Sequence, residues 1–246
     1  MKFRHLSLSL IAMNLATAGI SAQTIKTVNP DFKGYEALLN AAGYELYSFD
    51  ISSLAPKKYA MTFSVKEFRD GKEVQSSFNR PSTFHNLTNI SDFTKWVSDK
   101  KEIDDIRQKA IDPANDVFSK AERINIGLYP GEADSIKNVL IEIDTEGSSG
   151  FRMELLPLPK MENESQTTCN YMYNARTFIM PEIFHANEFI PLVGVMSFYY
   201  DNEYNVFRCC GETNLSPDIQ NSALLNRTPH AYIIGVTLKE EEKENK

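Results

Sequence analysis

The chain has few of the residues that mark several large protein classes. It contains three cysteines and one tryptophan among 246 residues, so it cannot form a disulfide scaffold. No apolar run reaches the roughly 20 residues that span a bilayer, and no transmembrane segment is predicted. Acidic side chains outnumber basic ones by 33 to 26, which gives a formal charge of −7. That charge argues against a nucleic-acid binder, which needs a basic face to displace counterions from phosphates.

The motifs of common catalytic and cofactor-binding sites are also missing. The sequence has no Gly-x-Ser-x-Gly elbow, no His-Glu-x-x-His zinc motif, no phosphate-binding loop and no dinucleotide-binding glycine motif. Metal-ligand spacings such as Cys-x-x-Cys are absent as well. The sequence therefore predicts no motif-borne catalytic residue, no metal ligand and no cofactor.

Residues 1–22 have the pattern of a secretory signal peptide. Lys2 and Arg4 make the start positive, an apolar run follows from Leu6 to Ile20, and Ala22 supplies the small residue that cleavage requires. We therefore expect export to the periplasm or the extracellular space. At the other end, the charged segment 239–246 has no apolar residue to bury and is predicted to be a disordered, solvated tail.

Most of the remaining chain shows the alternating hydrophobicity of half-buried strands. Strands are predicted over 44–52, 59–66, 72–78, 124–128, 139–143, 151–155, 175–180, 192–200, 205–210 and 231–238. Asp70-Gly71 is a strong hairpin signal between the second and third of these. About ten short strands without regular strand–helix alternation predict a mainly β domain over residues 23–238, either an antiparallel sandwich or a partly open barrel. The alternative is an α+β chain in two domains.

Helical signals occur near the start of the predicted domain. The segment from Asp31 to Ala42 is predicted to be a short helix, with Asp31 as its cap and Gly43 as its left-handed end. Leu38 and Leu39 are expected to pack against the rest of the molecule.

A second helical region interrupts the strands. From Ser91 to Ala110 apolar residues recur at roughly helical spacing, and Trp96 among them is expected to pack. Asp112-Pro113, a cap followed by proline, predicts another short helix to about Ala121. Residues 91–121 are thus expected to form a helical insertion at one end of a sheet.

The cysteines are Cys169, Cys209 and Cys210. An exported protein meets oxidising conditions, so a disulfide is expected where geometry allows it. Cys209 and Cys210 are neighbours on a predicted strand and point to opposite faces, so only one of them readily meets Cys169. Cys209 shares its face with Phe207, which is assigned to the core. We predict a disulfide between Cys169 and Cys210 and a free, buried thiol at Cys209.

A predicted hairpin tip gathers tyrosines and carboxylates. Its members are Tyr199, Tyr200, Asp201, Glu203 and Tyr204. Exposed tyrosines beside carboxylates are typical of an edge that stacks sugars or binds a partner, although alternate aromatic residues also fill cores. Glu142, Asp144 and Glu146 lie on or after another predicted strand. Glycoside hydrolysis needs two facing carboxyl groups, which acidic clusters of this kind can supply.

Three segments are similar in style to exported proteins of unknown function from Bacteroides-type bacteria. They are Ile20-Ser21-Ala22-Gln23, the sheet stretch 44–51 and the closing stretch 232–238. The resemblance implies a periplasmic or surface location and no catalytic residue.

Two functions follow from the sequence. The first is an exported, non-catalytic β-protein that binds a glycan, a peptide or an envelope protein. The alternative is a carboxylate-dependent hydrolase of the glycosidase type.

Overall fold

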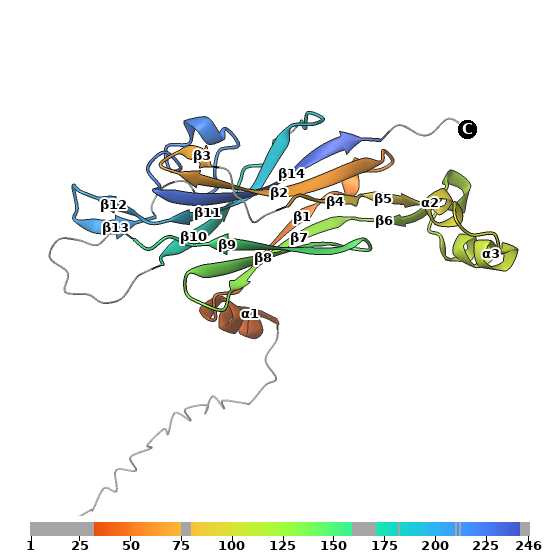
Figure 1. Ribbon diagram of the computed structural model, residues 1–246, viewed down its shortest axis with the longest axis horizontal. Coiled ribbons are helices and arrows are strands. Elements are labelled where there is room, and N and C mark those ends of the chain that lie inside the picture. The colour runs from red at the N-terminus through yellow and green to blue at the C-terminus, as the bar shows by residue number, and fades with distance from the viewer. Residues whose placement is uncertain are drawn as a thin grey trace, which may run out of the picture.

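The computed structural model describes residues 32–74, 80–158, 171–181, 183–209, 211 and 213–241. These residues form two antiparallel sheets that pack face to face, so the predicted mainly β fold is confirmed as a sandwich (Figure 1). The predicted signal peptide, Cys169 and Cys210 lie outside the described residues. Within these ranges, no helix is long and apolar enough to cross a membrane.

The first sheet contains four strands of the described chain in the order β1-β7-β8-β9. Their bounds are Glu45–Asp50 for β1, Arg123–Pro130 for β7, Ile136–Ile143 for β8 and Gly147–Glu154 for β9. Apolar residues occupy every second position, so one face of the sheet is buried and the other faces solvent. The alternation seen in the sequence therefore assigns these strands to a half-buried sheet.

The second sheet has the order β10-β11-β14-β2-β3, and β4 also pairs with β2. The bounds are Tyr173–Thr177 for β10, Phe189–Ser197 for β11, His230–Glu240 for β14, Tyr59–Arg69 for β2, Lys72–Val74 for β3 and Ser82–His85 for β4. β14 pairs with β2 from His230 opposite Arg69 to Glu240 opposite Tyr59. The last strand thus takes its partner from the first half of the chain, and it continues two residues into the segment expected to be a tail.

Both faces of the second sheet are covered. Its inner face contributes Met61, Phe63 and Ile234 to the main core between the sheets. Its outer face is covered by the segment after Gly211, whose Leu215 and neighbouring leucines form a second core with β11 and β14. Strands β11 and β14 are therefore nearly continuous apolar runs, because each residue faces one of two cores.

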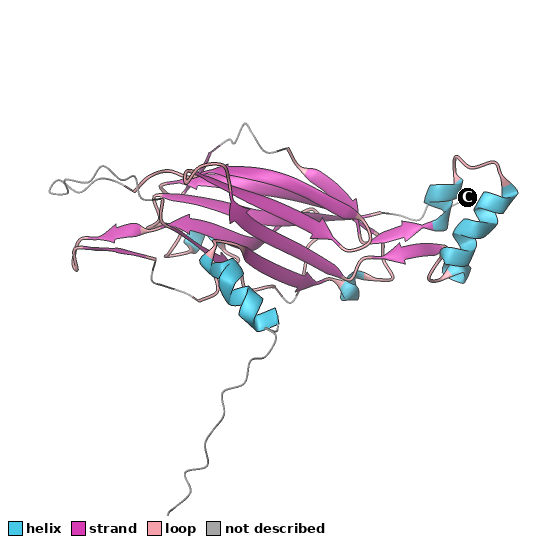
Figure 2. Ribbon diagram, turned by 90° about the horizontal axis from the view of Figure 1, so that it is seen from below, coloured by secondary structure: helices cyan, strands magenta, loops and turns pink. Residues whose placement is uncertain are grey.

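A helical arm, residues 87–120, projects from one end of the sandwich (Figures 1 and 2). It contains β5 (Leu87–Asn89), α2 (Ile90–Thr94), α3 (Lys100–Lys109) and β6 (Val117–Lys120). The predicted helix after Asp112 is wrong. Asp112 caps only the 3-10 turn Pro113–Asn115, because Asp116 adopts a left-handed φ of 63°. Val117–Lys120 then pairs with β5, a long-range partner that local sequence signals do not reveal.

The remaining described elements are a hairpin, the first helix and two 3-10 turns. The hairpin β12 (Tyr199–Asp201) and β13 (Val206–Arg208) projects from the end opposite the helical arm (Figure 1). The predicted first helix is confirmed as α1 (Phe32–Ala41), and Gly43 has the expected left-handed φ of 83°. The expected packing of Leu38 and Leu39 is wrong, since their side chains are 69% and 47% exposed. Helix α1 lies beside the first sheet with Tyr35, Leu38 and Leu39 exposed (Figure 1). Short 3-10 turns also occur at Ser52–Leu54 and Ile219–Asn221.

Candidate functional site

The helical arm exposes three large apolar side chains, Phe93, Trp96 and Ile111, which we call the tip residues. Trp96 is 86% exposed, and Phe93 and Ile111 are 45% and 61% exposed. The expected packing of Trp96 is wrong, because α2 ends at Thr94 and Trp96 falls in the turn before α3. Large apolar side chains exposed on one projection make this end of the arm a candidate interaction surface.

The arm holds part of this surface in place from within. The Phe93 ring packs on the ring of Phe118 in β6, with centroids 4.5 Å apart and an angle of 54° between the planes. The backbone N–H of Ile111 donates to the carbonyl oxygen of Phe118 at 3.1 Å. Phe118 therefore positions the Phe93 ring and the backbone of Ile111, which lowers the entropic cost of presenting these residues to a partner.

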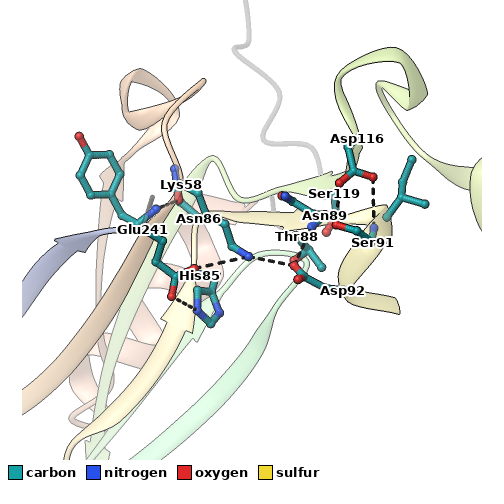
Figure 3. A network of polar contacts seen from close by, with 12 residues as sticks. Lys58, His85, Asn86, Thr88, Asn89, Ser91, Asp92, Asp116, Ser119 and Glu241 are labelled. Carbon is teal, nitrogen blue, oxygen red and sulfur yellow. Dashed lines mark hydrogen bonds and ion pairs between the residues drawn. The ribbon is translucent and has the colours of Figure 1, made fainter. Parts of the chain in front are cut away.

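An ion-pair network fixes the arm to the second sheet (Figure 3). Lys58 Nζ lies 2.9 Å from Asp92 Oδ2 of α2 and 3.5 Å from Glu241 Oε2, just beyond β14. His85 Nε2 lies 3.2 Å from Glu241 Oε1. Burial works against charge on Lys58, but the hydrogen bonds and charges of Asp92 and Glu241 together outweigh it and raise the Lys58 pKa. Partial burial likewise opposes charge on Asp92, and the bonds from Lys58 and the Asn89 N–H lower the pKa of that carboxyl.

A second set of contacts ties the arm to itself (Figure 3) and, through Glu146, to the first sheet. Asp116 accepts from the Ser91 backbone N–H at 3.2 Å and from the Ser91 hydroxyl at 2.6 Å. Glu146, in the turn between β8 and β9, accepts from the hydroxyls of Thr88 and Ser119. The base of the arm is thus bonded to both sheets, which limits how far the arm can swing.

The structure brings the predicted tyrosine–carboxylate cluster together on the β12–β13 hairpin. Arg208 occupies its centre: it lies 4.1 Å from the ring centroid of Tyr204 and 3.2 Å from Asp201 Oδ2. The Tyr200 ring packs on Phe207 at 5.3 Å.

Other members of this cluster take part in local structure. The Glu203 backbone N–H donates to Asp201 Oδ1, which closes the turn, and Tyr199 packs against the second core. The exposed remainder centres on Tyr204, 58% exposed. Most of the cluster therefore holds the hairpin together and leaves one tyrosine available to a partner.

One of the three cysteines lies in the described part of the chain. Cys209 follows β13 as a free cysteine and is half-buried rather than fully buried. Its carbonyl oxygen accepts from the Arg176 guanidinium. The disulfide expected between Cys169 and Cys210 lies outside the described residues and stays a prediction.

The acidic residues considered for hydrolysis are engaged in hydrogen bonds between strands. Asp144 Oδ1 accepts from the backbone N–H groups of Glu122 and Arg123, at 3.0 and 2.9 Å. Glu142 accepts from the Asn125 amide at 3.3 Å. Elsewhere, hydrogen bonds from Ser52 lower the pKa of Asp50, the opposite of the raised pKa that a catalytic acid needs.

Sequence reasoning missed a buried polar network at the end of the sandwich away from the helical arm. His230 and Glu67 are 1% and 7% exposed, and His230 Nε2 lies 3.3 Å from Glu67 Oε1. Tyr173 Oη lies 2.5 Å from His230 Nδ1, and Arg69 pairs with Glu67 at 2.7 Å. Burial lowers the His230 pKa, and Glu67 offsets this only in part.

Chemistry fixes the direction of these hydrogen bonds. A carboxylate only accepts, so the neutral ring of His230 donates from Nε2 to Glu67 and accepts at Nδ1 from Tyr173. The available signal was Glu67 itself, a charged residue at a core-facing position of an otherwise apolar alternation. Because His230 and Glu67 are buried, we interpret this network as stabilising the fold rather than binding a ligand.

Among the described residues, no group of three or more His, Cys, Asp or Glu side chains is placed to hold a metal ion. A family model for a domain of unknown function, DUF5041, matches residues 14–240, and the chain belongs to that family. Searches among curated proteins and among solved structures found no match.

Proposed function

We propose that this member of the DUF5041 family is an exported, non-catalytic binding protein that docks onto a protein partner, such as a neighbouring envelope protein, through its helical arm. The observation that carries the proposal is Trp96, 86% exposed on a projecting element that is bonded to both sheets. Exposed tryptophans are enriched among the few residues that dominate binding energy at protein interfaces. Export, to the periplasm or outside the cell, rests on the pattern of residues 1–22.

The charge of the arm favours a protein over a lipid surface or a nucleic acid. Residues 87–120 contain six basic and seven acidic side chains, a net charge of −1. Polyanionic partners attract surfaces with clustered basic residues, which this arm does not have. Apolar tip residues surrounded by mixed charges are typical of a protein interface with an apolar centre and a polar rim.

The hydrolase alternative has less support. A glycosidase needs two facing carboxyl groups, one of them with a raised pKa. Asp144 and Glu146 instead accept hydrogen bonds that hold strands and the arm together. Asp50 and Asp92, the described carboxyl groups with shifted pKa values, are shifted downward. We therefore propose binding without catalysis.

Site-specific photo-cross-linking in the producing cells tests this proposal. A photoreactive phenylalanine analogue replaces Trp96 in one variant, Tyr204 of the hairpin in a second and Leu140 of the first sheet in a third. All three positions are exposed, so they differ in location rather than in access. We expect one discrete protein adduct from position 96 and none from the other two.

Affinity then decides whether the adduct reflects docking. The cross-linked protein is identified and purified, and its binding to the full chain is measured by calorimetry. Trp96→Ala is expected to weaken binding about 30-fold, the effect of removing a dominant interface residue. A discrete adduct from position 204 but not from position 96 would contradict the proposal and favour the hairpin cluster. Equal affinity of Trp96→Ala and the unmodified chain would also contradict it.

A further inference from the structure

The outer face of the first sheet carries an ordered row of polar and aromatic side chains. The strand register places Tyr129 of β7, Asn138 of β8 and Arg152 of β9 side by side. Tyr44, just before β1, extends the row, since its ring stacks on that of Tyr129 with centroids 6.4 Å apart and planes 13° apart. These side chains face away from the core because the alternate residues of each strand are buried.

A cavity of about 600 Å³ lies over part of this row. Its lining residues are Arg80, Ser82, Tyr129, Asn138, Gly150, Phe151 and Arg152. Arg80 and Ser82 come from the side of β4, beyond the edge of β9, so the second sheet closes one side of the cavity. A volume of this size lies within the range of sites that hold small organic ligands.

Glycines alternate with exposed leucines in the row beside the cavity. The next row across the sheet pairs Leu46 with Gly127, Gly127 with Leu140, and Leu140 with Gly150. A Cβ added at Gly150 would lie 3.9 Å from its nearest neighbour, the carbonyl oxygen of Val139. Gly150, which lines the cavity, therefore leaves room for a ligand next to the row of Tyr129, Asn138 and Arg152.

The chemistry of this row fits a sugar ring. A pyranose has an apolar face that packs on an aromatic ring, here Tyr129, and a rim of hydroxyls that need both donors and acceptors. Asn138 offers an amide donor and a carbonyl acceptor. The Arg152 guanidinium is held at 2.7 Å by Glu132, which fixes the charged end of the row.

We propose that this row binds an uncharged saccharide chain, laid across β7, β8 and β9 with one sugar ring on Tyr129. The charges around the row balance: Arg80 and Arg152 line the cavity, and Glu132 and Glu154 lie 2.7 and 3.8 Å from the Arg152 guanidinium. The protein as a whole carries −7, so nothing here favours an acidic glycan over a neutral one. The site is separate from the helical arm, so this inference does not depend on the proposed function.

Affinity electrophoresis of the full chain provides the first test. The protein runs in native gels that contain soluble β-glucan, xylan, mannan or dextran as neutral probes, or polygalacturonate as an acidic probe. We expect at least one neutral polysaccharide to retard the protein and polygalacturonate to have no effect. Absence of retardation by every neutral probe, or retardation by polygalacturonate alone, would overturn the proposal.

Variants locate the binding. For a hexasaccharide of the retarding glycan, Tyr129→Ala is expected to weaken binding about tenfold or more by calorimetry, while Tyr129→Phe stays within about threefold. Gly150→Gln fills the cavity without strain and should weaken binding to a similar degree. It keeps the test decisive if Tyr129→Ala does not fold.

Trp96→Ala, in the helical arm, is the matched control and should bind the hexasaccharide as the unmodified chain does. If folded Gly150→Gln binds with unchanged affinity, the saccharide does not occupy this row and the proposal is wrong. If Trp96→Ala binds as weakly as Tyr129→Ala, the proposal is equally wrong.

Discussion

Asn86 lies where the chain leaves β4 for the helical arm, and its removal should destabilise the protein far more than an ordinary polar substitution. The residue is 1% exposed. Its side-chain oxygen accepts from the Tyr59 backbone N–H at 2.7 Å, and its amide donates to the Lys57 carbonyl at 2.9 Å. Asn86→Ala leaves both backbone groups without these partners.

The two groups do not lose equally. Lys57 is exposed, so its carbonyl can bind water and loses the net value of one hydrogen bond, about 1 kcal/mol. The Tyr59 N–H lies at the half-buried start of β2, and an unsatisfied donor there costs about 1–3 kcal/mol. We expect Asn86→Ala to lower the free energy of unfolding by about 2–4 kcal/mol. For a chain of this length that loss lowers the melting temperature by roughly 4–16 °C.

Urea unfolding followed by far-UV circular dichroism measures this loss. Asn125→Ala is the matched control, since Asn125 makes its hydrogen bonds to Ser48 and Glu142 on the outer sheet face, and it should cost less than about 0.5 kcal/mol. Equal costs for Asn86→Ala and Asn125→Ala would refute the assignment of two structural hydrogen bonds to Asn86.

Asn86→Asp separates the donor from the acceptor. The new carboxylate keeps an acceptor for the Tyr59 N–H but turns a negative oxygen toward the Lys57 carbonyl. Burial raises the pKa of such a group, so its stability deficit should be largest at neutral pH and should shrink as the pH falls toward 4, where protonation restores a donor. A deficit that does not change with pH would count against this geometry.

Three further outcomes are expected. Burial lowers the pKa of His230, so the unfolded chain binds a proton at this residue before the folded protein does as the pH falls below about 6.5. The urea midpoint of the unmodified protein should therefore drop between about pH 7.5 and 5.5, and the midpoint of His230→Gln should drop less. Gly43→Ala should cost about 1–2 kcal/mol in the same assay, because φ is 83° there and the new Cβ would lie 3.2 Å from Pro130 Cγ. Trp96, the single tryptophan, should fluoresce like an indole in water and be quenched fully by acrylamide, and a blue-shifted, protected emission would show that it packs. Trp96→Ala should change the free energy of unfolding by less than about 0.5 kcal/mol.

The strands could be predicted because their cause is local. Alternation along 124–128 and 139–143 follows from one buried and one solvated sheet face, and the strands appear where the pattern placed them. The Asp70-Gly71 turn is equally local: both residues take the positive φ that the tight hairpin between β2 and β3 needs.

The arm could not be predicted in the same way. Asp112 and Pro113 do form the expected cap, yet Val117–Lys120 becomes a strand because it pairs with Leu87–Asn89, far back in the sequence. Helical spacing predicted that Trp96 lies on a packed helix face. Because α2 ends at Thr94, Trp96 is not part of a helix, and the spacing does not predict which way its side chain points. The tip residues follow from where two short helices end, which the apolar pattern alone does not specify.

Burial separates two kinds of polar and aromatic side chain in this sandwich. Asn86 and His230 are each 1% exposed with their polar groups bonded inside the protein, so substitutions there should change unfolding rather than binding. Trp96 and Arg152 lie on exposed faces, and their substitution should change binding at nearly constant stability.

Lys58 falls between these classes, because its ion pairs set the position of the arm while its side chain is 20% exposed. If the arm must be held rigid for docking, Lys58→Met should weaken partner binding while Trp96 remains as exposed to acrylamide as before. Undiminished binding in that variant would show that the tip residues act without the network at their base.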